Sequence, residues 1–244
     1  MPTPIGNLSD MVPRAVQVLQ QVDVIAAEDT RHSAPLMRHF DIGTPMWAYH
    51  DHNEEEQAER LVALILEGKS VALISDAGTP LVSDPGFRLV EKATQAGVKV
   101  VPIPGAVAAM AALSASGLPS DRFVFEGFLP AKAAKRVSAL EALLSETRTL
   151  IFYESSHRIL DTLQAMHDVF GEERKVCVAR EITKQYETIK TAALSDLVVW
   201  MQADSNQQRG EFVIMLEGVE HELSAEDFEF AKTLMLWPSI DPPF

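Results

Sequence analysis

The sequence predicts an α/β protein built from two α/β domains. Short apolar runs of strand length alternate with amphipathic segments of helix length in both halves of the chain. Loops rich in glycine and proline follow several of the apolar runs, and the longest lies within residues 71–86. With 244 residues, the chain is long enough for two domains, each with its own core. We expect mainly parallel strands in the first domain and a mixed sheet in the second.

In the first half, apolar residues at helical spacing predict a helix over 12–22. Pro13 fits the first turn of this helix, and Ser9 or Asp10 can cap it. The other elements expected here are strands at 24–27, 71–75 and 98–103, helices at 54–67 and 87–96, and a helix of small residues within 104–117. Together these elements predict an N-terminal domain over 1–118.

In the second half, residues 118–122 (LPSDR) look like a linker, so the second domain is predicted to span 119–218. The expected elements are strands at 123–126, 149–153, 176–179 and 211–217, and helices at 133–145 and 157–170. The tail, 219–244, is acidic, then apolar, then proline-rich. It is too short to form a domain.

Composition limits the classes of partner and compartment. A net charge of −14 argues against a general nucleic-acid binder and against DNA, although a local basic cluster at Lys132, Lys135 and Arg136 leaves a specific RNA contact open. The single cysteine, Cys177, lies in an apolar run and is predicted to be a small core residue. No apolar stretch is long enough to span a membrane, so we expect a cytoplasmic protein.

Three clusters of polar residues are candidate sites. Asp76 and Gly78 follow a predicted buried strand, where ligands of open α/β sheets bind, but an ordinary strand-to-helix turn explains the pattern equally well. Residues 28–31 (EDTR) also follow a strand, and an internal ion pair is the alternative there. In the triplet at 50–52 (HDH), a strand would point Asp51 away from both histidines, so we expect no metal site.

Several nucleotide and hydrolase motifs are missing from the sequence. There is no G-x-G-x-x-G after a strand, no G-x-x-x-x-G-K-[ST] and no G-x-S-x-G. Kinase, NTPase and α/β-hydrolase interpretations are therefore weak. Glycine- and proline-rich loops at strand ends still suit a ligand that carries a nucleoside.

A series of motifs in order gives a more specific interpretation. The motifs are PTPIGNL at 2–8, AAEDTR at 26–31, HDHNE at 50–54, SDAGTPLVSDPG at 75–86, PSDRFVFEGFLPAK at 119–132, FYESSHR at 152–158 and AREITK at 179–184. This set resembles the bacterial methyltransferases that modify the 2′-oxygen of a cytidine ribose in 16S ribosomal RNA, within the tetrapyrrole (corrin and porphyrin) methylase superfamily. The resemblance covers nearly all of residues 2–218.

The resemblance implies two α/β domains, a homodimer and S-adenosylmethionine held in the cleft between the domains. Residues 219–244 would be a remnant of, or a replacement for, a small helical C-terminal domain. The residues implied to bind the cofactor are Pro4, Ile5, Gly6, Asp76, Gly78, Thr79, Ala106, Val107, Ala108, Phe152 and Tyr153. Val107 stands where the family usually has a serine or cysteine.

The implied reaction moves the sulfonium methyl group to a ribose hydroxyl, which is a poor nucleophile at neutral pH. By motif position, Asp29 is the candidate proton acceptor and Glu154 the alternative base. Arg31 and Lys132 are candidates for orienting phosphate or charge. Two alternatives stay open: methylation of a tetrapyrrole carbon, and a non-catalytic module that binds the cofactor or RNA.

Overall fold

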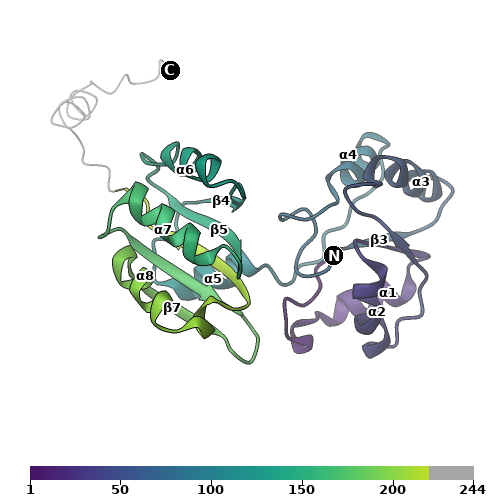
Figure 1. Cartoon of the computed structure of the whole chain (residues 1–244). Coiled ribbons are helices and arrows are strands. Elements are labelled where there is room, and N and C mark those ends of the chain that lie inside the picture. The colour runs from purple at the N-terminus through teal and green to yellow at the C-terminus, as the bar shows by residue number, and fades with distance from the viewer. Residues whose placement is uncertain (220–244) are drawn as a thin grey trace, which may run out of the picture.

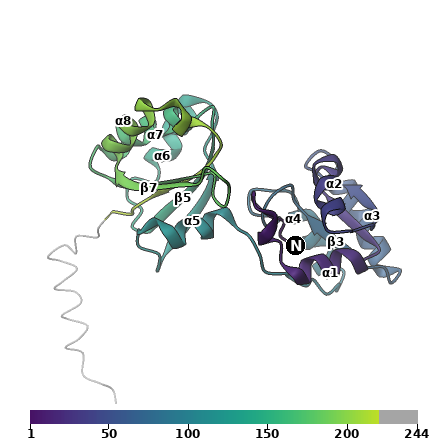
Figure 2. The ribbon, with the colours of Figure 1, turned by 90° about the horizontal axis from the view of Figure 1, so that it is seen from below.

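Two separate sheets organise the chain in a computed structural model, which describes residues 1–219 (Figure 1). The first sheet contains three strands and the second contains five. Each sheet has helices on both of its faces (Figure 2). The chain is therefore an α/β protein with two layered lobes, as the sequence predicts. The tail predicted at 219–244 lies outside the described residues except for Val219.

The first sheet is entirely parallel, in the order β2-β1-β3. Its strands are β1 (Val24–Ala27), β2 (Met46–Ala48) and β3 (Val71–Ile74). All four residues of β1 are buried, as expected for the central strand of a sheet that is covered on both faces. Helices α1 (Pro13–Gln21) and α2 (Thr30–His39) pack on one face, and α3 (Glu54–Leu66) and α4 (Phe87–Gln95) pack on the other.

The second sheet is mixed, in the order β4-β5-β8-β6-β7. Its strands are β4 (Phe123–Phe128), β5 (Thr149–Ser155), β6 (Lys175–Arg180), β7 (Thr188–Ala193) and β8 (Glu211–Leu216). Strand β8 lies at the centre and runs antiparallel to both β5 and β6. Helices α6 (Ala133–Glu141), α7 (Ile159–Phe170) and α8 (Leu194–Ala203) cover one face.

Helix α5 (Ala108–Ser116) covers the opposite face of the second sheet. Its small side chains pack against residues such as Cys177 and Met215, which confirms that Cys177 is a buried core residue. The sequence predicts this helix within the N-terminal domain, 1–118. Because α5 packs with the second sheet, the chain crosses between the lobes within 96–107. The domain boundary at 118/119 stays a prediction.

One predicted strand, 98–103, is wrong. A valine-rich run becomes a strand only when a neighbouring strand supplies hydrogen bonds. Among the described residues, none pairs with this run, and Val100 and Val101 remain 47% and 49% exposed. The predicted cap of α1 is also wrong. Residue Val12 occupies the N-cap, because Leu8–Asp10 forms a separate 3-10 turn that Asn7 caps.

Besides that 3-10 turn, five elements were not predicted. Helix α2 contains Pro35, which reads as a helix breaker, and β2 has only three residues. Strand β7 and helix α8 follow one another directly, so no turn residue separates them in the sequence. A further short 3-10 helix, Ser205–Gln208, precedes β8. In residues 1–219, no helix is both long and apolar enough to cross a membrane.

Candidate functional site

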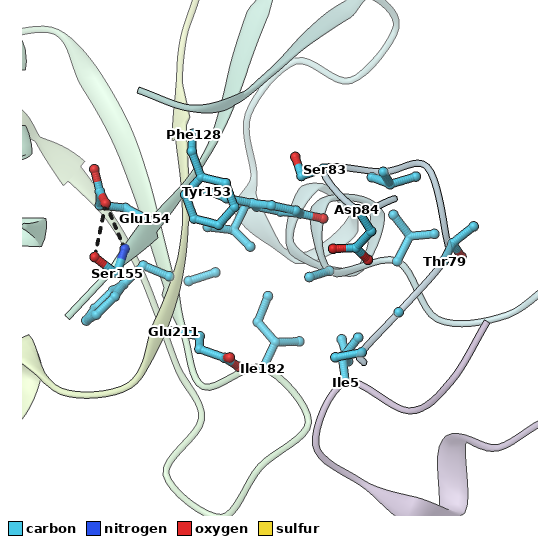
Figure 3. A pocket seen from close by; sticks show the side chains of 18 of the residues that line it. Ile5, Thr79, Ser83, Asp84, Phe128, Tyr153, Glu154, Ser155, Ile182 and Glu211 are labelled. Atoms are coloured by element: carbon cyan, nitrogen blue, oxygen red, sulfur yellow. Dashed lines mark hydrogen bonds between the residues drawn. The ribbon is translucent and has the colours of Figure 1, made fainter. Parts of the chain in front are cut away.

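A cavity of ≈ 280 Å³ lies where the two lobes meet, close to the size of small-molecule sites. Its walls are mostly apolar. From the first lobe it is lined by Ile5, Ala77, Gly78, Thr79, Val82, Ser83 and Asp84. From the second lobe it is lined by Val107, Ala108, Phe128, Tyr153, Glu154, Ser155, Ala179, Ile182, Lys184, Glu211, Phe212 and Val213 (Figure 3). A ligand bound in this cavity would touch both lobes.

The loop after β3 forms the first-lobe wall and is held at its start by three hydrogen bonds. Thr3 and Gly78 exchange backbone hydrogen bonds of 2.9 and 3.1 Å. The Thr79 hydroxyl donates to the Ala106 carbonyl at 2.9 Å. Gly78 has a φ of +79°, and a Cβ atom there would lie 3.3 Å from Ile5. These contacts bring the segments around residues 5, 78 and 106 together.

The far end of the same loop is held by Glu54, the last residue of the HDHNE motif. Its carboxylate accepts hydrogen bonds from the backbone N–H groups of Gly86 (3.0 Å) and Arg88 (3.2 Å) and from the Tyr49 hydroxyl (3.0 Å). Glu54 therefore caps α4, whose N-cap residue Gly86 has no side chain to do so. Between these anchors, Leu81 and Ser83 both adopt positive φ values, 71° and 64°.

The second-lobe wall is built from regular strands and an aromatic cluster. The Tyr153 ring packs edge-on against Phe125 and Phe128, with centroids 4.9 and 5.7 Å apart. Its hydroxyl accepts a hydrogen bond of 3.2 Å from the Ala109 backbone at the start of α5. Because successive residues of a strand face opposite sides, Tyr153 faces the cavity, whereas Phe152 lies in the core beneath α6 and α7.

Glu154 is held in place by several partners. Its side chain is fully buried, and Arg158 lies 2.7 Å away as an ion pair. The Ser155 backbone N–H and the Thr162 hydroxyl also donate to it, both at 2.8 Å. Figure 3 shows its carboxylate beside Ser155, on the far side of Tyr153 from the middle of the cavity. Arg158 also donates to the Leu129 carbonyl at 3.1 Å, so this network joins β5 to the segment after β4.

Acidic side chains gather on the opposite side of the cavity. Burial raises the pKa of Asp84 to about 6, and the negative charges of Glu28, Asp76 and Asp51 also contribute to this rise. A hydrogen bond from the Ser75 hydroxyl acts in the opposite direction and lowers this pKa. Burial also raises the pKa of Glu28. Two hydrogen bonds link the ends of β1 and β3. The Asp76 backbone N–H donates to the Glu28 carboxylate at 3.2 Å, and the Asp29 backbone N–H donates to the Asp76 carboxylate at 3.1 Å.

The structure brings most of the residues with an implied cofactor role to this cavity. Six of them line it: Ile5, Gly78, Thr79, Val107, Ala108 and Tyr153. Pro4, Gly6, Asp76 and Ala106 are chain neighbours of lining residues. The side chain of Phe152 belongs to the opposite face of the sheet, and Phe152 does not line the cavity. The cofactor roles themselves stay predictions.

Of the four catalytic candidates, only Glu154 lines the cavity. The Asp29 carboxylate instead caps α2 and forms a 2.9 Å ion pair with Arg31, and a hydrogen bond from Arg31 lowers the pKa of Asp29 to about 2. The Arg31 side chain is 90% exposed. Lys132 is exposed at the N-cap of α6. These positions favour surface or structural contacts for the three residues that are not in the cavity.

Sequence reasoning did not select several lining residues. Asp84 lies inside the motif at 75–86, but nothing in the sequence indicated that it faces the cavity. Phe128, Ile182 and Lys184 lie inside motifs that carry the resemblance, so motif position could have found them. Glu211 and Phe212 have no local signal, because β8 enters the centre of the sheet from far along the chain.

The HDH triplet lies in the turn before α3, not in a strand. The rings of His50 and His52 are 5.9 Å apart. Within residues 1–219, no group of three or more His, Cys, Asp or Glu side chains is arranged to hold a metal ion.

Comparison with known proteins gives both a family and close relatives. The family profile described as Tetrapyrrole (Corrin/Porphyrin) Methylases matches residues 2–198. A Pseudomonas aeruginosa protein named ribosomal RNA small subunit methyltransferase I is 58% identical over 216 residues, which cover 88% of this chain and 77% of that protein. A protein of the same name from Escherichia coli O157:H7 is 55% identical over 227 residues, 93% of this chain and 79% of that protein.

Solved structures share the fold at low sequence identity. The crystal structure of the methyltransferase CobJ superposes with a TM-score of 0.63 and 18% identity, covering 88% of this chain and 91% of that one. This likeness supports the two-lobed α/β architecture and does not bear on the substrate.

Proposed function

Because the chain belongs to the tetrapyrrole (corrin/porphyrin) methylase family, we propose that it moves a methyl group from S-adenosylmethionine to the 2′-oxygen of a cytidine ribose in 16S ribosomal RNA. Methylation of small-subunit ribosomal RNA is supported by the sequence identity of 55–58% to two proteins named as methyltransferases of that RNA. The cytidine and the 2′-oxygen come from the motif resemblance.

The cavity has the chemistry that S-adenosylmethionine, the methyl donor, requires. Apolar and aromatic walls at Ile5, Ile182 and Phe128 suit an adenine ring. The N-terminus of helix α5 lies in the cavity wall at Val107 and Ala108 and has no side-chain cap from its N-cap residue Val107, so the positive end of its dipole suits a carboxylate. Asp76 and Asp84 place negative charge near one wall, which suits a cationic ligand. The residues present therefore fit the cofactor.

When bound, the cofactor supplies an electrophilic methyl group on a positively charged sulfur. The protein's own contribution is to hold this group in line with the ribose hydroxyl and to exclude water, which lowers the entropic cost of the reaction. The paired anchors of the loop after β3, at Thr79 and Glu54, fix the first-lobe wall before any ligand binds. The hydroxyl proton needs an acceptor.

RNA binding would use local positive charge, because the chain as a whole is strongly acidic. Arg31 and Lys132 are exposed and remain our candidates for phosphate contacts. The proposed partner is 16S ribosomal RNA within the small subunit, in the cytoplasm. The homodimer that the resemblance implies stays a prediction.

The test is transfer of tritium from labelled S-adenosylmethionine to small ribosomal subunits purified from cells that lack this modification. Nuclease mapping then locates the label. We expect one labelled nucleotide, a cytidine resistant to alkaline cleavage at its 2′-O-methyl group. Label on a base atom would contradict the 2′-oxygen assignment. Label on a porphyrinogen or precorrin, with none on RNA, would favour the tetrapyrrole branch of the family.

The same protein and cofactor also distinguish an enzyme from a non-catalytic binding module. Calorimetry measures cofactor binding independently of transfer. Binding of the cofactor with no transfer to either class of substrate would indicate a binding module.

A further inference from the structure

Three carboxylates line the cavity among residues 1–219, at Asp84, Glu154 and Glu211. Glu154 is neutralised by Arg158, and its oxygens already accept hydrogen bonds from Ser155 and Thr162. Glu211 is 78% exposed and forms an ion pair with Lys184 at 2.7 Å. Asp84 forms no ion pair with any residue in 1–219. It is therefore the lining carboxylate whose charge no cation balances within these residues, which favours it as the acceptor of a proton from a substrate.

The position of Asp84 is fixed by the backbone around it. Its loop is tied to Ala106 through Thr79 and to Glu54 through Gly86. Leu81 and Ser83 adopt positive φ values in the same loop, a strained conformation for residues with a Cβ atom. Strain of this kind persists when the surroundings over-determine it, and it is common at sites where one side chain must be aimed.

The second lobe completes the surroundings of Asp84. Figure 3 shows its carboxylate in the cavity near the Tyr153 hydroxyl. The two groups affect each other, since the pKa of Tyr153 is raised by burial and, to a smaller extent, by the charge of Asp84. The other groups that act on Asp84 are Glu28, Asp51 and Asp76, all acidic, and the Ser75 hydroxyl. Lys184, in the second-lobe wall, is paired with Glu181 and Glu211.

We propose that the Asp84 carboxylate accepts the proton of the substrate hydroxyl during methyl transfer, in place of Asp29 or Glu154. The bond that forms joins the methyl carbon to the ribose 2′-oxygen, and the bond that breaks joins this carbon to sulfur. The electron pair of the broken bond stays on sulfur, which becomes a neutral thioether. The hydroxyl proton moves to a carboxylate oxygen of Asp84 and is later released to water. This inference rests on the proposed function.

A base works best when its pKa lies near the working pH, because it is then ionised and still binds a proton well. A pKa of about 6 for Asp84 meets this condition, whereas the low pKa of Asp29 makes that carboxylate a weak base. The direction in which the transfer rate changes with pH is testable. Below pH 6 Asp84 is protonated and cannot accept a proton, so the transfer rate rises with pH and levels off above about pH 7.

The experiment measures single-turnover methyl transfer to unmodified small subunits between pH 5 and 9, with Asp84→Asn, Asp84→Glu and a control, Asp161→Asn. Asp161 is an exposed residue in the first turn of α7 and does not line the cavity. We expect Asp84→Asn to lower the rate about 10²- to 10³-fold and to remove the dependence on pH near 6. Asp84→Glu should recover part of the rate, and Asp161→Asn should match the unchanged protein.

Two readouts do not depend on turnover. Calorimetry should show that Asp84→Asn still binds the cofactor, with an affinity that falls far less than the transfer rate does. The carboxyl ¹³C resonance that is lost in Asp84→Asn should titrate near pH 6, well above an ordinary aspartate. A resonance that titrates near pH 4 would contradict the proposal.

The failures of the two proposals are distinguishable. If the unchanged protein labels RNA and Asp84→Asn labels it at a comparable rate with the same pH dependence, the role of Asp84 is wrong and the proposed function stands. If the unchanged protein binds the cofactor and labels no RNA, the proposed function is wrong and the role of Asp84 falls with it.

Discussion

The two walls of the cavity use carboxylates in opposite ways. In the strand wall of the second lobe, Glu154 is fully buried and its charge is balanced by Arg158. In the loop wall of the first lobe, Asp84 is half-buried beside other acids and has no cationic partner among the described residues. A carboxylate with every oxygen satisfied holds a structure together, whereas one kept short of partners is available for chemistry. The difference predicts opposite effects when each is neutralised.

The largest expected loss of stability is at Glu154, in the strand wall. Glu154→Leu leaves the Arg158 guanidinium without its partner and the Thr162 hydroxyl without an acceptor, so we expect the free energy of unfolding to fall by about 3 kcal/mol. Urea unfolding followed by circular dichroism measures this. The double variant Glu154→Leu/Arg158→Leu should recover part of the loss, because no unpaired charge remains.

A different result would support Glu154 as the base, which is the alternative that motif position suggests. If Glu154→Gln kept full stability and normal cofactor binding but lost methyl transfer, Glu154 would be acting on the substrate, and the contrast between the walls would be wrong.

The next effect concerns the place where the two walls meet. Gly127 on β4 has a φ of +67°, and a Cβ atom there would lie 3.0 Å from the Ser83 hydroxyl oxygen, next to Asp84. We expect Gly127→Ala to cost about 1–2 kcal/mol through the left-handed backbone and to shift the loop. Gly97→Ala has a similar φ, +73°, with open space around the new Cβ atom.

The comparison of these two alanines separates strain from contact. Both should lose stability in thermal unfolding, but only Gly127→Ala should also slow methyl transfer. Equal methyl-transfer rates in the two variants would mean that the Ser83 side chain can shift without moving Asp84.

Much of the fold follows from local sequence, and the exceptions have a common physical cause. Strand β1 was predicted with its exact bounds, since four apolar residues between polar turns suit a strand buried on both faces. The run 98–103 has the same local signal, yet it lacks a pairing partner among the described residues. Whether an apolar run becomes a strand depends on its neighbour in space, which local sequence does not specify.

The site shows the same limit. Motif order identified the loops that line the cavity, including Gly78 and Thr79. It pointed to Glu154, whose side chain is neutralised by Arg158 four residues later, and not to Asp84. The high pKa of Asp84 arises from burial in the assembled cavity and from acids brought in by β1 and the turn before α3. These contacts join residues far apart in the chain, so no local pattern reports them.

A smaller effect, opposite in sign to that at Glu154, is expected from Asp84→Asn. The pKa of Asp84 is raised in the folded protein, so the folded state holds more protons than the unfolded state between pH 4 and 6 and loses stability as the pH rises through this range. At pH 7.5 the ionised carboxylate is therefore a cost that asparagine removes. Discounted for partial exposure to solvent, the gain should be on the order of 1 kcal/mol.

Thermal unfolding at two pH values tests this. Asp84→Asn should melt at a higher temperature than the unchanged protein at pH 7.5 and at the same temperature at pH 3.5, where both side chains are neutral. A gain in stability combined with a loss of activity is typical of active-site residues. A loss of stability at pH 7.5 would instead place Asp84 with Glu154 as a structural group.

The smallest effect is expected at Asp29, whose carboxylate is exposed and serves α2. Asp29→Asn keeps an oxygen that can accept from the Arg31 and His32 N–H groups, whereas Asp29→Ala removes the cap. Both variants lose the ion pair with Arg31 and should lower the melting temperature, the asparagine by less because it keeps the cap, and both by less than Gly127→Ala does. Since the pKa of Asp29 is lowered to about 2, this contribution is present above about pH 4 and is lost as the pH falls toward 2. If Asp29→Asn abolished methyl transfer while the melting temperature stayed unchanged, the acidic end of β1 would take part in the reaction, and the division of roles between the two walls would have to include it.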